Sequence, residues 1–361
     1  MTQVTRRQFA IASATVALSS LIRADFSRAA ERAPAPAPAS ADPLAHVHPE
    51  LRPGLEQFLK MSPHNEWSEK TIADIRNRGR EYTPAPLAEP AYAERMIPGA
   101  AGHPDVRIYV IGAQSTGAPR PAVLHIHGGG YVAGTARQAV PKMQQLSAAH
   151  DCVVVTVDYR LAPETKFPGS LEDNYAALRW LHTHAAELGV DRNRIALLGE
   201  SAGGGHVAAL AIAARDRGEF PVAFQVLIYP MLDDRTGSTR PTAPHIGAYV
   251  WTAQANRFGW SSLLGMPAGS ASPPHGSVPA RVENLHGLPP AFIGTGGIDL
   301  FVEENIAYAQ RLLQAGVPTE LYVAPGAYHG FDLFVPEAPI SKKFTAAWND
   351  ALGRALKGHC C

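Results

Sequence analysis

The sequence predicts an α/β protein, in which helices flank a mostly parallel β-sheet and a small helical segment precedes the sheet. From residue 106 onward, short apolar runs alternate with helical patterns. Such an alternation is typical of parallel strands that are connected by helices. The chain has 361 residues and 46% of them are hydrophobic, which is enough for one large domain with a small appendage.

Seven short apolar runs have the length and the residue types of buried strands. They are Val106–Val110, Val123–Ile126, Val153–Val157, Ile195–Leu198, Phe224–Ile228, Phe292–Gly294 and Leu321–Val323. Five helical stretches separate or follow the later runs: Val140–His150, Leu171–Leu188, Ala202–Arg217, Glu303–Ala315 and Ser341–Leu356. We therefore expect helices on both faces of the sheet.

Three segments precede the main domain, which we expect to span residues 91–361. Residues 1–30 hold the pair Arg6-Arg7, an apolar stretch and small residues, and they resemble a bacterial Tat signal peptide. The Ala/Pro-rich residues 31–42 predict an extended tether. Residues 43–90 have apolar residues at helical spacing and predict a helical cap. A protein with such a signal peptide is expected to be periplasmic or secreted. The alternative interpretation of residues 1–30 is a disordered tail in which the arginine pair occurs by chance.

The charge balance and the cysteines exclude several classes of partner. Lys and Arg number 32, as do Asp and Glu, so the chain has no basic footprint for nucleic acid or for an anionic membrane. No apolar run reaches the length of about 18 residues of a spanning helix, so we expect no stable membrane anchor after signal cleavage. The three cysteines have no zinc-type spacing. A monomer and a homodimer both remain open.

Gly199-Glu200-Ser201-Ala202-Gly203 follows an apolar run and opens a helical stretch of small residues. In a strand–turn–helix elbow, flanking glycines permit a sharp turn that leaves the serine hydroxyl free at the edge of the sheet. The pattern is weak alone, but here both the strand and the helix are present. Ser201 is the candidate nucleophile.

His127-Gly128-Gly129-Gly130 ends an earlier strand. Bare glycine backbone can bring N–H groups close to a developing negative oxygen, so we expect an oxyanion hole from Gly128, Gly129 and Ala202. A flexible glycine turn is the alternative. His125 and His127 could also form a metal pair at i and i+2, but no third ligand stands in a suitable context, and no metal is expected.

His329 follows the last predicted strand, and Asp299 follows the strand before it. In a Ser…Asp…His chain order, the histidine is the general base and the carboxylate orients it. His359, past the final helix, is a poor rival for the base. The rivals for the acid are carboxylates after an earlier strand or at the start of the following helix: Asp233, Asp234, Glu303 and Glu304.

Four motifs in order resemble the bacterial hormone-sensitive-lipase family of α/β-hydrolase esterases. They are His127–Gly130 with Tyr131, Asp158–Glu164, the stretch from Leu288 to Gly316, and His329–Phe331. The chain departs from the family pattern at Glu200, where Asp or Thr is usual, and at Val302 and Glu303, where Arg and Asp are common. The resemblance makes Asp158 and Arg160 structural residues.

The resemblance implies a serine carboxylesterase that hydrolyses small esters with short-to-medium acyl chains through an acyl-enzyme, without a cofactor. Tyr131 and two residues of an aromatic patch, Tyr249 and Trp251, are expected beside the substrate. An amidase, or a deacetylase for a carbohydrate or antibiotic, would use the same triad. A binding module without activity is a rival from another class, although Ser201, Asp299 and His329 are all present.

Overall fold

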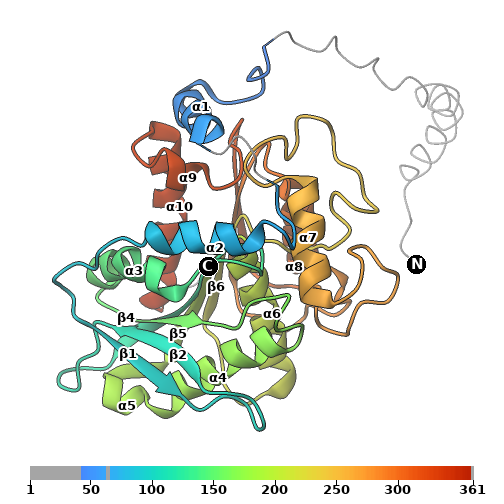
Figure 1. The fold of residues 1–361 in the computed structure, drawn as a ribbon. Helices are drawn as coiled ribbons and strands as arrows, with labels where there is room; N and C mark the ends of the chain where they lie inside the picture. The colour runs from blue at the N-terminus through green and yellow to red at the C-terminus, as the bar shows by residue number, and fades with distance from the viewer. Residues whose placement is uncertain (1–41, 62–65, 359–361) are drawn as a thin grey trace, which may run out of the picture. The chain divides into compact units, whose positions relative to one another are not determined.

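One eight-stranded sheet forms the centre of the computed structural model, which describes residues 42–61 and 66–358 (Figure 1). The predicted signal peptide, all of the predicted tether except Asp42, and His359, Cys360 and Cys361 lie outside the described residues. The strands are β1 (Tyr92–Ile97), β2 (Val106–Ile111), β3 (Arg120–Ile126), β4 (Val153–Asp158), β5 (Val190–Glu200), β6 (Phe224–Ile228), β7 (Ala291–Gly296) and β8 (Thr319–Ala324).

The strand order is β1-β2-β4-β3-β5-β6-β7-β8. β2 pairs antiparallel with both β1 and β4, and every pairing from β4 to β8 is parallel. The mostly parallel sheet is thus confirmed, and each of the seven predicted strands overlaps an observed one. The sequence analysis missed β1, because this edge strand is mostly exposed and has no apolar run.

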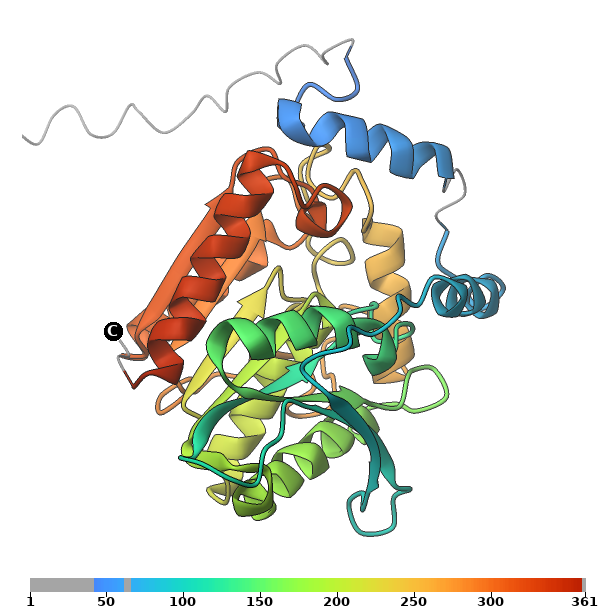
Figure 2. The same ribbon diagram turned by 90° about the vertical axis from the view of Figure 1, so that its left-hand side faces the viewer.

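Helices cover both faces of the sheet (Figure 2). On one face, α3 (Ala136–His150) and α10 (Pro339–Leu356) lie side by side, since His150 and Asn349 share a hydrogen bond of 3.1 Å. On the other face, one apolar cluster joins the strands to the remaining long helices. These are α4 (Gly169–Thr183), followed by the short α5 (Ala185–Leu188), α6 (Ala202–Arg217) and α8 (Val302–Gln314).

The described residues of the predicted cap segment include two short helices. A turn of 3₁₀ helix, η1 (Pro49–Leu51), leads into α1 (Arg52–Met61), and α2 (Ile72–Glu81) follows. The ring of Phe58 in α1 packs 4.9 Å from Phe334 in α9 (Phe331–Phe334). In α2, the guanidinium of Arg76 donates to the carbonyl oxygens of Val132 and Ala162 and pairs with Glu164.

The long connection between β6 and β7 leaves the sheet and carries η2 (Pro279–Arg281) and a helix that the sequence analysis did not identify, α7 (Ala253–Leu264). Thr252 caps α7 by accepting a hydrogen bond from the N–H of Ala255. A second apolar cluster joins α7 to Ile72 of the cap, Tyr131 and Trp251. Within the described ranges, no helix is both long enough and apolar enough to cross a bilayer.

Candidate active site

Ser201 lies on a tight turn between the end of β5 and the start of α6. Its backbone has φ 57° and ψ −122°, a region that a residue with a side chain rarely adopts. Glycine is required two positions after it, because a Cβ at Gly203 would lie 2.0 Å from the carbonyl oxygen of Ile126. The turn leaves Ser201 at the carboxyl end of the sheet, in the wall of a cavity.

Two hydrogen bonds link the predicted nucleophile, base and acid: Ser201, His329 and Asp299. Nε2 of His329 lies 2.9 Å from Oγ of Ser201, and its Nδ1 lies 2.8 Å from Oδ2 of Asp299. Asp299 is fully buried after β7, and its other oxygen accepts the N–H of Phe301 over 3.0 Å. With the carboxylate on Nδ1, the tautomer that leaves Nε2 free to accept the serine proton is favoured.

Aromatic rings surround the imidazole of His329. The rings of Tyr229 and Phe301 meet it edge-on at 4.9 and 5.2 Å, and Trp251 lies 6.3 Å away. These contacts fix the plane of the imidazole and limit the access of water to it.

The predicted oxyanion glycines lie directly beside the nucleophile. A Cβ at Gly128 would lie 3.3 Å from Cβ of Ser201 and 2.8 Å from the carbonyl oxygen of Glu200. Gly129 has φ 120°, and Ala202 is the first residue of α6 and is fully buried. Only glycine leaves room at Gly128 for a backbone N–H to approach an oxygen held by Ser201.

A cavity of about 400 Å³ opens above Ser201 and has two kinds of wall. Its apolar wall comes from the cap, the β6–β7 connection and α9, with Trp67, Val250, Trp251, Leu333 and Phe334. Its polar wall comes from the N-terminal half of α3 with its cap residue, from β3 and from the elbow, with Thr135, Gln138, Lys142, His125 and Glu200. The site can therefore hold a largely apolar molecule of small size.

Comparison with known proteins identifies the family. Residues 123–333 match a family model that is described as alpha/beta hydrolase fold. The chain is 35% identical to Esterase LipI of Mycobacterium tuberculosis, over 88% of this chain and 99% of LipI. It is 33% identical to Carboxylesterase NlhH of the same species, over 86% of this chain and 98% of that protein.

Solved structures agree with this result. A structure named Bacterial Heroin Esterase superposes with a TM-score of 0.76 at 36% identity, and the match covers 86% of this chain and 98% of that one. An esterase of Pyrobaculum calidifontis superposes with a TM-score of 0.73 at 30% identity, over 87% of this chain and all of that one. The chain belongs to the hormone-sensitive-lipase family of α/β-hydrolase esterases. The prediction of a carboxylic ester hydrolase is confirmed at the level of this family.

Of the three aromatic residues that the sequence analysis placed beside the substrate, only Trp251 lines the cavity. Tyr131 has φ 67°, which turns its side chain into the core, where its hydroxyl donates to the carbonyl oxygen of Met231 over 2.8 Å. Tyr249 is half-buried outside the lining, next to Val250, which does line the cavity. Sequence reasoning missed Trp67 and Lys142, because each reaches the site through a contact between distant segments.

Glu200, a departure from the family pattern, connects the elbow to two other side chains. Its carboxylate pairs with Lys142 over 3.0 Å and with Nε2 of His125 over 2.9 Å. Nδ1 of His125 lies 2.8 Å from the hydroxyl of Thr156. Burial alone would raise the pKa of Glu200, but Lys142 and His125 outweigh burial and hold this pKa well below its usual value. The carboxylate of Glu200, directly before Ser201 in the elbow, is therefore charged.

The two histidines of the alternative metal site have other partners. His125 uses both ring nitrogens as described above, and Nδ1 of His127 lies 2.7 Å from the carbonyl oxygen of Gly128. Burial lowers the pKa of His127 to about 4, so its ring is neutral at pH 7. In the part of the chain that the structure describes, no three His, Cys, Asp or Glu side chains form a group that could hold a metal ion.

The rival carboxylates lie in other interactions. Asp233 pairs with Arg235 and Arg240, and Asp234 pairs with Arg281. Glu304 accepts the N–H groups of Leu232 and Asp233 and is buried, whereas Glu303 is exposed on α8.

The family reading of Asp158 and Arg160 as structural residues fits their contacts. Oδ1 of Asp158 accepts the N–H of Ala136 at the start of α3. The guanidinium of Arg160 pairs with the buried Asp173 over 2.7 Å. These two residues therefore hold helices in place beside the sheet.

Proposed function

We propose that the protein is a serine carboxylesterase for small esters with short-to-medium acyl chains, with Ser201, His329 and Asp299 as its catalytic triad. The observation that carries this proposal is the position of His329, which lies 2.9 Å from the Ser201 hydroxyl and 2.8 Å from the Asp299 carboxylate. The family membership of the chain supports the ester bond as the one that is cleaved.

In the proposed first step, Nε2 of His329 takes the proton of Ser201 while Oγ attacks the ester carbonyl carbon. The negative charge that develops on the carbonyl oxygen is stabilised by the N–H groups of Gly128, Gly129 and Ala202. The tetrahedral intermediate then expels the alcohol, which receives its proton from His329. The acyl group stays on Ser201 as an ester.

In the second half, a water molecule gives its proton to Nε2 of His329 as its oxygen attacks the acyl carbon. The same N–H groups stabilise the second oxyanion. When this intermediate collapses, Oγ of Ser201 leaves and regains the proton from His329, and the carboxylic acid is released. The buried Asp299 stabilises the imidazolium that forms in both halves.

Two features support the proposed preference for short acyl chains: the size of the cavity, about 400 Å³, and the indole rings in its wall. Each acyl CH₂ that is buried adds about 0.8 kcal/mol of binding, until the chain reaches the end of the cavity. We therefore expect kcat/KM on 4-nitrophenyl esters to be highest near C4 to C6 and to fall at least about tenfold by C12. Equal activity on C12 or C16 esters and on butanoate would contradict this preference.

The triad by itself does not select esters over amides, so the leaving group needs its own test. Matched pairs of 4-nitrophenyl butanoate with 4-nitrobutyranilide, and of phenyl acetate with an acetylated sugar, separate an esterase from an amidase or a carbohydrate deacetylase. We expect the simple esters to have the higher kcat/KM in both pairs. A higher value for the anilide or the acetylated sugar would favour the alternative.

A further inference from the structure

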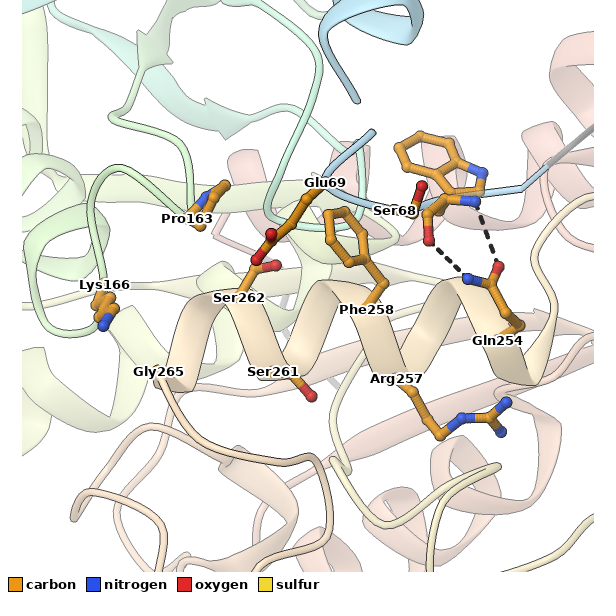
Figure 3. A pocket seen from close by; sticks show the side chains of 11 residues that line it. Ser68, Glu69, Pro163, Lys166, Gln254, Arg257, Phe258, Ser261, Ser262 and Gly265 are labelled. Atoms are coloured by element: carbon orange, nitrogen blue, oxygen red, sulfur yellow. Dashed lines mark hydrogen bonds between the residues drawn. The ribbon is translucent and has the colours of Figure 1, made fainter. Parts of the chain in front are cut away.

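A second cleft, with a volume of about 720 Å³, lies beside the active-site cavity, between the segment 67–69 and α7. Figure 3 shows Phe258 and Ser262 projecting from α7 into this outer cleft, on the side that faces Glu69. Pro163 and Lys166 close another side of it. The outer cleft thus offers an aromatic face together with hydroxyl and charged groups.

One side chain borders both spaces. Trp67 lines both the active-site cavity and the outer cleft, and it is the only described residue that the two linings share. Its indole ring meets the ring of Trp251 edge-on at 5.0 Å. Trp251 in turn packs against Gly130, where a Cβ would lie 2.1 Å from the indole. The two indoles therefore form a continuous wall that begins beside the oxyanion glycines.

The backbone of Trp67 is held in place by α7. The side-chain amide of Gln254 accepts the N–H of Trp67 over 3.3 Å and donates to its carbonyl oxygen over 2.6 Å (Figure 3). Trp251, the inner member of the wall, donates from its indole to Asn256 in the same helix over 3.2 Å. Both indoles are thus positioned by the first turn of α7, with the cavity on one side and the outer cleft on the other.

We propose that Trp67 determines the size of ester that this enzyme accepts, by closing the active-site cavity against the outer cleft. This inference rests on the proposed ester hydrolysis at Ser201. With Trp67 in place, the reacting ester must fit a space of about 400 Å³. Without the indole, the two spaces join, and an ester with an additional ring on its acyl or alcohol arm gains a compartment in which that ring contacts Phe258.

The test compares esters that differ by one ring. The acyl pair is 4-nitrophenyl butanoate with 4-nitrophenyl 4-phenylbutanoate. In the alcohol-extended ester, biphenyl-4-yl butanoate, a phenyl ring replaces the nitro group, so its kcat/KM is compared only between variants and the wild type. Burying one ring contributes about 1.5–3 kcal/mol, which corresponds to roughly 10- to 100-fold in kcat/KM. For Trp67→Ala, we expect the ratio of kcat/KM for at least one extended ester to kcat/KM for 4-nitrophenyl butanoate to rise by that factor relative to the wild type.

A second substitution shows whether the gain comes from the outer cleft. Ser262→Phe places a ring in that cleft from α7. By itself, Ser262→Phe should leave kcat/KM for all three substrates unchanged. Combined with Trp67→Ala, it should remove the gain in kcat/KM on the extended ester. A folded Trp67→Ala enzyme without a gain on either extended ester would overturn the proposal, and so would a gain that persists in the double variant.

Two controls keep the result interpretable. If Trp67→Ala loses its cooperative thermal transition, Trp67→Leu takes its place, because leucine retains an apolar contact with Trp251. Trp67→Leu should also raise kcat/KM on an extended ester. Wild-type activity on butanoate, and its loss in Ser201→Ala, test the proposed function separately. If those two results hold and the extended esters do not respond, only the role of Trp67 is wrong.

Discussion

Lys142 and Glu200 form an ion pair in the wall of the active-site cavity, with 3.0 Å between Nζ of Lys142 and Oε1 of Glu200. Glu200 immediately precedes Ser201, the candidate nucleophile. The Glu200 side chain is only 12% exposed, so its charge depends on Lys142 and His125 for compensation. The pair joins α3 to the elbow and fixes the backbone from which Ser201 projects.

Replacing Lys142 with Met should leave this buried carboxylate partly uncompensated. Because the Lys142 side chain is 34% exposed, we expect a loss of about 1–3 kcal/mol in the free energy of unfolding at pH 7, less than for a fully buried pair. A carboxyl whose pKa is lowered by folding contributes stability that is present above its unfolded pKa, about 4.3, and is lost as the pH falls below it. The difference from wild type in urea titrations should therefore be largest near pH 7 and should shrink below pH 4. Lys142→Arg keeps the charge and serves as the control, and an equal loss in both variants would show that the charge is not the cause.

Asp299→Asn should lower kcat by roughly 10³–10⁴, because an amide cannot stabilise the imidazolium and favours the wrong tautomer of His329. Asp233→Asn is a matched control, since Asp233 is equally buried but pairs with Arg235 and Arg240. Its kcat should change by less than about tenfold, although its stability should fall. A larger loss of kcat in Asp233→Asn, or in Asp234→Asn, would mean that the acid is misassigned.

The stability of the fold should fall in mild acid because of buried neutral histidines. Burial lowers the pKa of His206 to about 3, and the ring lies among the aromatic side chains of Tyr131 and Tyr159. Below pH about 6.5 the unfolded chain binds a proton at this residue and the folded chain does not, so stability is lost as the pH falls toward 3. Between pH 7 and pH 5 this residue alone should cost about 2 kcal/mol.

Both His206→Leu and His206→Gln remove the titrating ring, and both should flatten the pH dependence of the free energy of unfolding over that range. Urea titrations at pH 7, 6 and 5 measure this slope. Variants that retain the wild-type slope would show that His206 is not one of its sources.

The twin-arginine pair gives a prediction about location, which rests on the sequence because residues 1–30 lie outside the described ranges. We propose that the protein is exported to the periplasm or beyond. Replacing Arg6 and Arg7 together with Lys should then leave active enzyme in the cytoplasm of a bacterial host, since a twin-arginine receptor reads this pair. Fractionation with a cytoplasmic marker enzyme measures the distribution, and unchanged periplasmic activity would point to another export route.

Local patterns were sufficient to predict seven of the eight strands and the residues around Ser201. Buried parallel strands such as β4 are continuous apolar runs, and the elbow needs glycines at fixed positions around the serine. The chain order then led to Asp299 and His329. The edge strand β1 gave no such signal, because most of its residues are exposed to solvent.

The walls of the cavity were harder to predict, because they depend on which distant segments meet. Tyr131 follows the oxyanion glycines directly, but its positive φ directs the side chain away from the cavity. Trp67 lies 134 positions before Ser201 and reaches the cavity through the contact of its segment with Gln254. Lys142 reads as a solvated helix residue, and only the packing of α3 against the elbow reveals its partner.

The proposed role of Ser201 is tested most directly by covalent labelling with a fluorophosphonate, followed by peptide mapping and by kinetics of Ser201→Ala. The probe transfers its phosphonyl group to an activated serine with loss of fluoride, so it reports the nucleophile itself. We predict one adduct per chain, on the peptide that contains Ser201, no adduct in Ser201→Ala, and a loss of roughly 10⁵–10⁶ in kcat in that variant with its thermal transition intact. An adduct on another residue, or a Ser201→Ala enzyme that keeps more than a tenth of the wild-type activity, would contradict the assignment.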